Sequence, residues 1–411
     1  MEETKLNSDL IDQIKDFNHQ KLTKEQEMLI DKLILNESLK DYYKKCGLCK
    51  ECKQPNTDVD WCLSCNSKNF IENFKNWTSG NLDIDIFIQK TQLKAKNRDE
   101  IIQWIDYDNF VNIENLSKEG FGSIYKAIWK NQNNQVCPVA LKCFYNSQDM
   151  TAELLKEVES HVLLNSSAHI VHCYGITKNL RSKDFMMVME YAENGTLRQY
   201  LNNNFNSLNW IQKLHNLLSI VRGLKAIHQI GLIHNNLHCS NILSHLHKVT
   251  ITDLGLCQPA NVKSSQTDNN LKIHRVLPYV APEVLRGDEY TQESDIYSFG
   301  IIAHEICTGM TPYNDMADEE FLDIKICQGL RPKSNYKIPQ LIIDIINQCW
   351  DADASKRPKA TELERLLNDL YLKAQQQNSV LYEQIKEANE INLNQYRLNV
   401  NDIETEYSGT F

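Results

Sequence analysis

The stretch HNNLHCSN at residues 234–241, followed by DLG at residues 253–255, decides the fold. An isolated Asp-x-Gly is usually a turn, so the second segment gains weight from its place twelve residues after Asn241. On the N-terminal side, residues 139–142 read VALK, an apolar strand that ends in a lysine. On the C-terminal side, residues 281–283 read APE. The order and spacing of these segments carry more information than any one of them.

Taken together, the segments match the signature set of protein kinases in order and spacing. The domain, residues 109–371, resembles a eukaryotic protein kinase and is most similar to the tyrosine-kinase-like branch. The resemblance implies an α+β fold with a β-rich lobe followed by a helical lobe. Strand-like runs from Trp104 and a mainly helical pattern beyond Leu197 agree with that order.

The parts that flank this domain also have recognisable patterns. A Cys-rich segment and the stretch WTSGN at residues 77–81 precede the domain, and in this the chain looks like members of a large expanded fungal kinase group. We expect five parts: a helical segment over 1–45, a zinc-knuckle-like segment over 46–66, a connector over 67–108 with a short helix near 84–90, the kinase-like domain over 109–371, and a helical tail over 372–411.

Within the first and last parts, two local patterns predict helices. Residues 23–26 fit a capping box. In the tail, one helical face carries Leu381, Ile385, Ala388 and Ile391. Such a face belongs either to a helix packed on its own domain or to one that binds a partner.

The kinase resemblance implies a site for ATP and magnesium. Lys142 is placed to hold the α- and β-phosphates, and Glu157 matches its acidic partner. Asn241 and Asp253 match the magnesium ligands, because Mg²⁺ prefers hard oxygen donors. The residues expected to contact the nucleotide are Ser117, Gly120, Gly122, Ile124, Ala140, Lys142, Glu157, Met189 as gatekeeper, Glu190 and Ala192 in the hinge, Asn241 and Asp253.

The catalytic loop departs from the family pattern H-R-D-L-x-x-x-N. Asn236 stands where the resemblance places the catalytic aspartate, beside the other catalytic positions Lys142 and Asn241. An amide accepts a hydrogen bond but takes no proton near neutral pH, and a positioned general base contributes roughly 10²–10⁴ in rate. Asn235 replaces the arginine that in many relatives pairs with an activation-loop phosphate, so phosphorylation of Ser264, Ser265 or Thr267 lacks that partner.

The glycine-rich loop is also altered. Ser117 and Glu119 occupy the first two glycine positions; Gly122 matches the third, and Gly120 adds flexibility. A glutamate about 5 Å from a phosphate charge costs roughly 1–3 kcal/mol. We therefore expect nucleotide binding to be weakened and not lost.

Other motifs concern the fold and the substrate platform. Arg357 is expected to pair with Glu283, and residues 295–300 to begin a long buried helix. Residues 277–280 look more like the substrate platform of a Ser/Thr kinase than that of a Tyr kinase.

The cysteines suggest a metal site. Five of the thirteen lie between Cys46 and Cys65, and residues 49–52 and 62–65 form two C-x-x-C pairs. Such pairs present four thiolates to one tetrahedral Zn²⁺. The expected ligands are Cys49, Cys52, Cys62 and Cys65, with Cys46 as a possible substitute. The alternatives are two redox pairs or merely reduced thiols.

Composition narrows the classes of partner. A net charge of −10 argues against a broad nucleic-acid surface. The first residues form no signal peptide, and no apolar run is long enough to span a bilayer. We expect a cytoplasmic protein whose partners are ATP and another protein.

Three functions compete. The leading one is a pseudokinase that binds nucleotide in signalling with lost or weak phosphotransfer. The second is an active Ser/Thr protein kinase in which another group or water replaces the base. The third is an interaction adaptor that no longer binds nucleotide, against which the retained Lys142, Glu157, Asn241 and Asp253 argue.

Overall fold

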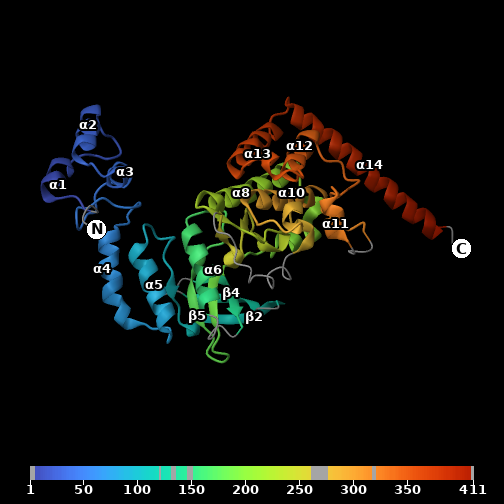
Figure 1. The fold of residues 1–411 in the computed structure, drawn as a ribbon. Helices are drawn as coiled ribbons and strands as arrows, with labels where there is room; N and C mark the ends of the chain where they lie inside the picture. Colours follow the sequence, from blue (N-terminus) through green and yellow to red (C-terminus); the bar gives the residue numbers. More distant parts are fainter. Residues whose placement is uncertain are drawn as a thin grey trace. The chain divides into compact units, whose positions relative to one another are not determined.

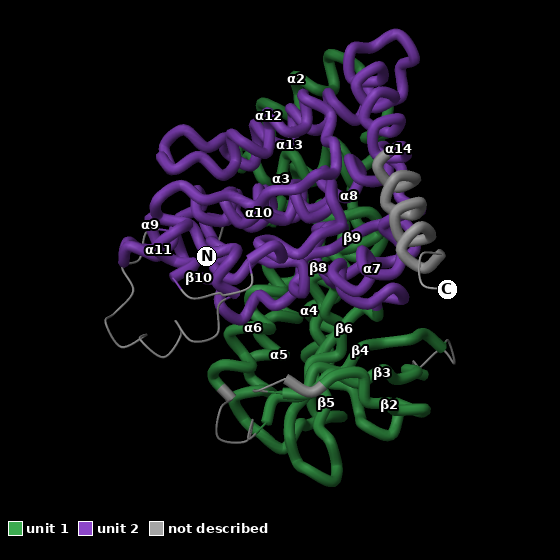
Figure 2. The backbone as a smooth tube through the Cα atoms, turned by 90° about the vertical axis from the view of Figure 1, so that its right-hand side faces the viewer, with its two compact units in different colours: residues 1–166, 172–191 green, residues 167–171, 192–411 purple. Residues whose placement is uncertain are grey.

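In the computed structural model two compact units make up the chain (Figure 2), residues 1–166 with 172–191 and residues 167–171 with 192–411. The structure describes residues 5–119, 122–130, 136–145, 151–260, 276–316 and 321–408. None of the helices in these ranges is both long enough and apolar enough to cross a membrane.

Among its described residues, the first unit combines six α-helices with a six-stranded sheet (Figure 1). Its helices are α1 (Ser8–Ile14), α2 (Lys24–Leu33), α3 (Glu37–Cys46), α4 (Leu63–Asn73), α5 (Leu82–Lys94) and α6 (Thr151–Leu164). Its strands are β1 (Gln103–Trp104), β2 (Phe110–Glu119), β3 (Gly122–Lys130), β4 (Val136–Phe144), β5 (Cys173–Lys178) and β6 (Phe185–Glu190). The spatial order is β1-β5-β6-β4-β3-β2, in which only β1 and β5 pair in parallel.

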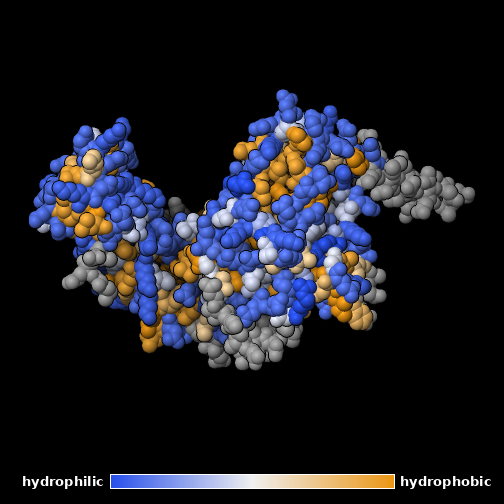
Figure 3. All heavy atoms as spheres, turned by 45° about the horizontal axis from the view of Figure 1, so that its top comes forward, coloured by the Kyte–Doolittle hydropathy of each residue, from blue (hydrophilic) through white to orange (hydrophobic). Residues whose placement is uncertain are grey.

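The N-terminal helices have a small core of their own. Ile14, Ile30 and Tyr43 are buried together, and the Tyr43 hydroxyl donates to the carbonyl of Ile14 at 2.8 Å. The predicted capping box is present at the start of α2, between Thr23 and Gln26. Outside this core the surface is partly apolar, since Figure 3 shows hydrophobic atoms over these helices among mostly hydrophilic ones.

The connector expected over residues 67–108 is more structured than a polar linker. It contains most of α4 and the whole of α5, which is longer than the short helix predicted near 84–90. The Asn81 side chain caps α5 by accepting hydrogen bonds from the amides of Asp83 and Ile84. Asp85 then accepts from both the amide and the hydroxyl of Ser79, at 2.8 and 2.5 Å. The WTSGN stretch therefore forms the turn that starts this helix.

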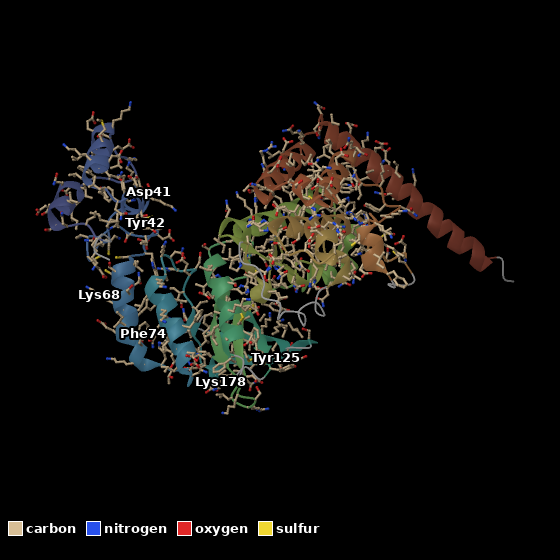
Figure 4. The ribbon with its side chains drawn as sticks, in the orientation of Figure 1. Asp41, Tyr42, Lys68, Phe74, Tyr125 and Lys178 are labelled. Carbon is tan, nitrogen blue, oxygen red and sulfur yellow. The ribbon has the colours of Figure 1, made fainter. Side chains whose placement is uncertain are left out.

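The two faces of the sheet have different roles. Alternate residues of a strand point to opposite faces, and Val139 and Leu141 on β4 join Val188 on β6 in a fully buried cluster. Tyr125, labelled in Figure 4, packs against this cluster from β3. Lys142 falls in the other alternation of β4 and so points to the opposite face.

The second unit is mostly helical. Its helices are α7 (Leu197–Asn204), α8 (Trp210–Gln229), α9 (Pro282–Leu285), α10 (Gln292–Thr308), α11 (Leu322–Cys327), α12 (Gln340–Cys349), α13 (Ala360–Ala374) and α14 (Val380–Ser408). Short antiparallel pairs join β7 (Leu232–Ile233) to β10 (Gln258–Pro259), and β8 (Ile242–Ser244) to β9 (Val249–Ile251).

Helix α10 is the centre of this unit. Every residue from Ser294 to Thr308 is buried, as expected for a helix enclosed by its own domain. Thr291 caps its start, and Gly309 ends it in the left-handed region with φ 74°.

The first half of α14 packs on the second unit. Leu381 and Ala388 are 0% and 1% exposed. The Trp210 indole donates to Asn389 at 3.0 Å, and the Lys337 amide donates to Asn392 at 2.7 Å. These contacts favour the expectation of a helix packed on its own domain.

Candidate functional site

The first cluster of predicted site residues lies in the first unit. Lys142 sits within β4, paired to Ile124 of β3 and to Met187 of β6. Its Nζ lies 2.6 Å from Oε1 of Glu157, which α6 supplies. The Glu157 side chain is only 4% exposed and that of Lys142 is 21% exposed. The structure thus brings together the lysine and the glutamate that the sequence predicted as partners.

The predicted adenine-side residues occupy neighbouring positions. Met189 at the end of β6 is 4% exposed and pairs with Ala140 of β4. The Glu190 amide donates to the carbonyl of His172 at 2.9 Å. In the second unit, Ala192 is 7% exposed and its carbonyl accepts from the amide of Gly195 at 3.2 Å.

The predicted glycine-rich loop is mostly strand. β2 continues through Ser117 to Glu119, and these residues pair with Ile124 and Gly122 of β3. Gly120 lies outside the described residues. A Cβ at Gly122 would overlap the backbone oxygen of Cys143, so the sheet itself requires glycine there.

In the second unit, Asp295 of α10 holds the loop that contains Asn235 and Asn236. Its carboxylate accepts the backbone amides of His234 at 2.8 Å and Asn235 at 3.0 Å. It also lies 2.9 Å from Nε2 of His228. With its own side chain only 2% exposed, Asp295 fixes the loop from the protein interior.

Asn235 has a conformational role that the sequence did not reveal. Its φ is 70°, in the left-handed region that Asn adopts more readily than most residues. Its side-chain amide donates to the carbonyl of Leu256 at 3.3 Å. The residue that replaces the expected arginine therefore joins this loop to the DLG segment.

Three predicted polar residues converge beside that loop. The Asn241 amide donates to Oδ2 of Asp253 at 3.1 Å and to the backbone oxygen of Asn236 at 2.9 Å. The Asn236 amide donates to the same Oδ2 of Asp253 at 3.4 Å. Two amides thus share one carboxylate oxygen, and this oxygen-rich group has the donor types that suit Mg²⁺.

His238 is a titratable group near this cluster that sequence reasoning missed. Burial, with a contribution from His234, lowers the pKa of His238 to about 4. The imidazole is therefore neutral at pH 7, and its ring packs against that of Tyr279, with 5.9 Å between the ring centroids. Its place two residues after Asn236 was the only signal in the sequence.

The predicted ion pair between Arg357 and Glu283 is formed and is bidentate. Nη1 and Nη2 of Arg357 lie 2.7 and 2.8 Å from the two carboxylate oxygens of Glu283. The Arg357 side chain is 0% exposed. This contact stabilises the fold and takes no part in chemistry. Residues 264–267, named above as phosphorylation candidates, lie outside the described residues.

The four predicted thiols form one cluster in the first unit. The sulfurs of Cys49, Cys52, Cys62 and Cys65 all lie within 4.8 Å of one another, with 3.8 Å between Cys49 and Cys65 and 3.4 Å between Cys52 and Cys62. Zn–S bonds of about 2.3 Å in a tetrahedron put sulfurs roughly 3.8 Å apart, so the cluster fits Zn²⁺.

The surroundings of the cluster define the ligand set more closely. The second pair sits at the start of α4, where Cys62 is the residue before the first helical turn. Burial raises the pKa of Cys62 and Cys65, so a metal that binds here displaces protons. Cys46 ends α3 and is not part of the four-sulfur group. Its suggested role as a substitute ligand has no support in this arrangement.

Comparison with known proteins gives a consistent family match. A family model described as "Protein tyrosine and serine/threonine kinase" matches residues 110–367, more than half of the chain. A probable serine/threonine-protein kinase of Dictyostelium discoideum is 27% identical over 284 residues, which cover 66% of this chain and 16% of the relative.

Two further probable serine/threonine-protein kinases of the same organism are similar. One is 28% identical over 257 residues, or 62% of this chain and 27% of the relative. The other is 27% identical over 289 residues, or 69% of this chain and 17% of the relative. The matched part therefore spans less than a third of each relative.

Proposed function

Because the chain belongs to the protein tyrosine and serine/threonine kinase family, we propose that it binds ATP with magnesium. We further propose that it is a pseudokinase, which transfers phosphate weakly or not at all. The hydrogen bond from the Asn236 amide to Asp253, at 3.4 Å, carries this proposal. An amide at the position of the base donates to the metal-binding carboxylate and takes no proton near neutral pH.

The other site residues have the roles expected for nucleotide binding. Lys142, oriented by Glu157, contacts phosphate oxygens. Asn241 and Asp253 hold Mg²⁺, which neutralises phosphate charge when bound. Met189 and Ala140 line the adenine side, with backbone groups of Glu190 and Ala192 as hydrogen-bonding partners. Ser117, Gly122 and Ile124 lie on the phosphate side.

An active Ser/Thr kinase is the main alternative, and the printed names of the relatives are compatible with it. In that case a group other than Asn236 must take the substrate proton. His238 is poorly suited, because its half-buried ring packs against that of Tyr279, with 5.9 Å between the ring centroids. The adaptor alternative is disfavoured by the Lys142–Glu157 contact of 2.6 Å, which a protein without nucleotide binding has no need to keep.

Further assignments complete the proposal. The four clustered thiols bind one structural Zn²⁺, because four thiolates leave no open coordination position. The chain belongs to the tyrosine-kinase-like branch and to the fungal group with a Cys-rich segment, acts in cytoplasmic signalling, and contacts a protein partner rather than nucleic acid. Exposed apolar residues such as Met28 and Leu35, at 74% and 83%, are compatible with a protein contact.

Nucleotide binding and phosphotransfer measured on one purified sample test the proposal. ATP with magnesium should raise the melting temperature, since a ligand at 100 Kd stabilises the folded state by about 2.7 kcal/mol. Lys142→Ala should remove most of that shift, whereas Lys130→Ala, at an exposed position of β3, should leave it unchanged. Labelled phosphate should remain on ATP. Transfer that Lys142→Ala abolishes would establish an active kinase, and no thermal shift at millimolar ATP would favour the adaptor.

A further inference from the structure

The segment that carries the cysteines closes the C-terminal end of α5. The last carbonyl groups of a helix have no partner within the helix and need donors from elsewhere. Three side chains from residues 57–67 supply donors at this helix end, to one carbonyl in the last turn, to the carbonyl of the C-cap residue and to the carbonyl just beyond it. They are the Ser67 hydroxyl to Leu93 O at 3.4 Å, the Trp61 indole to Ala95 O at 2.9 Å and the Thr57 hydroxyl to Lys96 O at 2.7 Å.

These donors depend on the thiol cluster for their position. Trp61 is only 5% exposed and directly precedes Cys62. Thr57 is joined to Trp61 by a backbone hydrogen bond at 2.9 Å, and Ser67 lies on α4 two residues after Cys65. A segment this short buries too little apolar surface to order itself, so metal-binding free energy becomes its folding free energy. Loss of the metal therefore loosens the donors at the end of α5.

Helix α5 in turn supports α6, the helix that supplies Glu157. It packs against α6, with Ile84 and Ile88 fully buried. Its last turn is also attached to the sheet, because the buried Gln92 amide donates to the carbonyl of Ile102 at 2.8 Å. Residues 103 and 104 then form β1, which pairs with β5.

The far end of this connection is held by side chains as well as by backbone. The ring of Trp104 on β1 lies 6.5 Å from that of Phe185, in edge-on geometry. Lys178 of β5, labelled in Figure 4, places its Nζ 4.6 Å from the centre of the Phe185 ring. A continuous series of contacts thus runs from the thiols through α5 to the helix and the sheet that hold Glu157 and Lys142.

We propose that the cysteine cluster is a regulatory zinc site. Zn²⁺ orders the side chains that cap the C-terminal end of α5 and thereby raises the affinity of the protein for nucleotide. This inference rests on the proposed nucleotide binding and adds its regulation. Zinc fixes Trp61, Trp61 fixes the end of α5, and α5 keeps α6 in the position where Glu157 orients Lys142. Because allosteric coupling between two ligands is reciprocal, nucleotide tightens zinc binding by the same factor, about 5- to 150-fold.

Reciprocal affinities of the full chain under reducing conditions test this coupling. ATP affinity is measured on zinc-loaded and chelator-stripped protein, and zinc affinity is measured against a chromophoric chelator with and without Mg-ATP. Both ratios should agree. Trp61→Phe keeps an aromatic ring but loses the N–H donor, so zinc should still bind while the coupling factor falls about 2- to 10-fold. Trp210→Phe is the control, because it also loses an indole N–H donor, the one that bonds Asn389 at 3.0 Å in the second unit, outside the series.

A second readout needs no nucleotide. Zinc removal should speed amide hydrogen exchange at the end of α5 and along α6, because local opening becomes easier when the caps are lost. If zinc binds but ATP does not, the proposed nucleotide function fails, and faster exchange in α6 still supports the structural coupling. If the protein binds no zinc, or if zinc changes neither ATP affinity nor exchange in α6, the inference is overturned.

Discussion

The loop at residues 234–241 has two sides that differ: the inner side, which is anchored to α10, is intact, and the side that carries Asn236 departs from the kinase pattern. On the inner side, Asp295 of α10 accepts two backbone amides of the loop. Arg357 supports the start of α10, because it donates to the carbonyl of Glu293 and holds Glu283 through two short contacts. On the other side, Asn236 replaces the expected carboxylate by an amide of almost the same shape. The contacts that build this loop and the atom that would perform chemistry are therefore separable, and each can be changed without the other.

The largest expected effect comes from breaking the inner side. Arg357→Ala removes the guanidinium that pairs with Glu283, whose side chain is 13% exposed. Breaking such a buried pair costs about 3–5 kcal/mol. Urea denaturation should therefore show a correspondingly lower free energy of unfolding.

The neighbouring lysine is a matched control for this change. Lys356 is 67% exposed and lies 3.6 Å from Asp353, so Lys356→Ala should cost less than about 1 kcal/mol. Equal costs for the two substitutions would show that the inner contacts do not stabilise the fold in the way described.

The second prediction restores the altered side. Asn236→Asp should raise phosphotransfer by about 10²-fold or more, equivalent to at least about 2.7 kcal/mol of barrier, with little change in nucleotide affinity. Glycine at positions 117 and 119 should then improve mainly nucleotide binding, because it lets the backbone approach the phosphates closely. Autophosphorylation and a basic protein substrate provide the assay. If the unchanged protein already transfers phosphate as fast as Asn236→Asp, and Lys142→Ala abolishes both activities, the pseudokinase proposal is wrong.

The same substitution should also change stability in a pH-dependent way. The new carboxylate at position 236 takes the place of the Asn236 amide, which lies 3.4 Å from Asp253. Repulsion between the two carboxylates raises the pKa of one of them. A raised folded-state pKa of an aspartate destabilises the fold once the pH exceeds the unfolded value of about 3.9. The loss should be complete at pH 7, smaller below pH 4, and reduced by magnesium. A loss that is independent of pH and magnesium would contradict this account.

The smallest expected effect concerns Asn235, which lies between the anchored part of the loop and Asn236. At φ 70°, an L-residue other than Asn or Gly costs roughly 1–2 kcal/mol. Asn235→Ala should therefore be less stable than Asn235→Gly by about 1 kcal/mol, a difference that thermal denaturation of the two variants measures directly. If Asn235→Ala is as stable as Asn235→Gly, or more stable, the backbone conformation does not explain why Asn suits this position.

The sequence predicted the parts of the site that depend on residue type at fixed spacing. The pairs Lys142–Glu157 and Arg357–Glu283 and the four-thiol cluster are formed as expected. It did not predict features that depend on distant backbone groups. The hydrogen bond from Trp61 to Ala95 crosses 34 positions and has no periodic signal, so the sequence does not predict that α4 and α5 are joined.

The steric requirement at Gly122 limits what this glycine can reveal about nucleotide binding. Any side chain there would strike the backbone of Cys143, so the sheet demands glycine whether or not a phosphate is ever bound. Selection for folding alone would therefore preserve Gly122, with or without selection for nucleotide binding. The presence of glycine at this position is no evidence for ATP binding, in contrast to the Lys142–Glu157 pair.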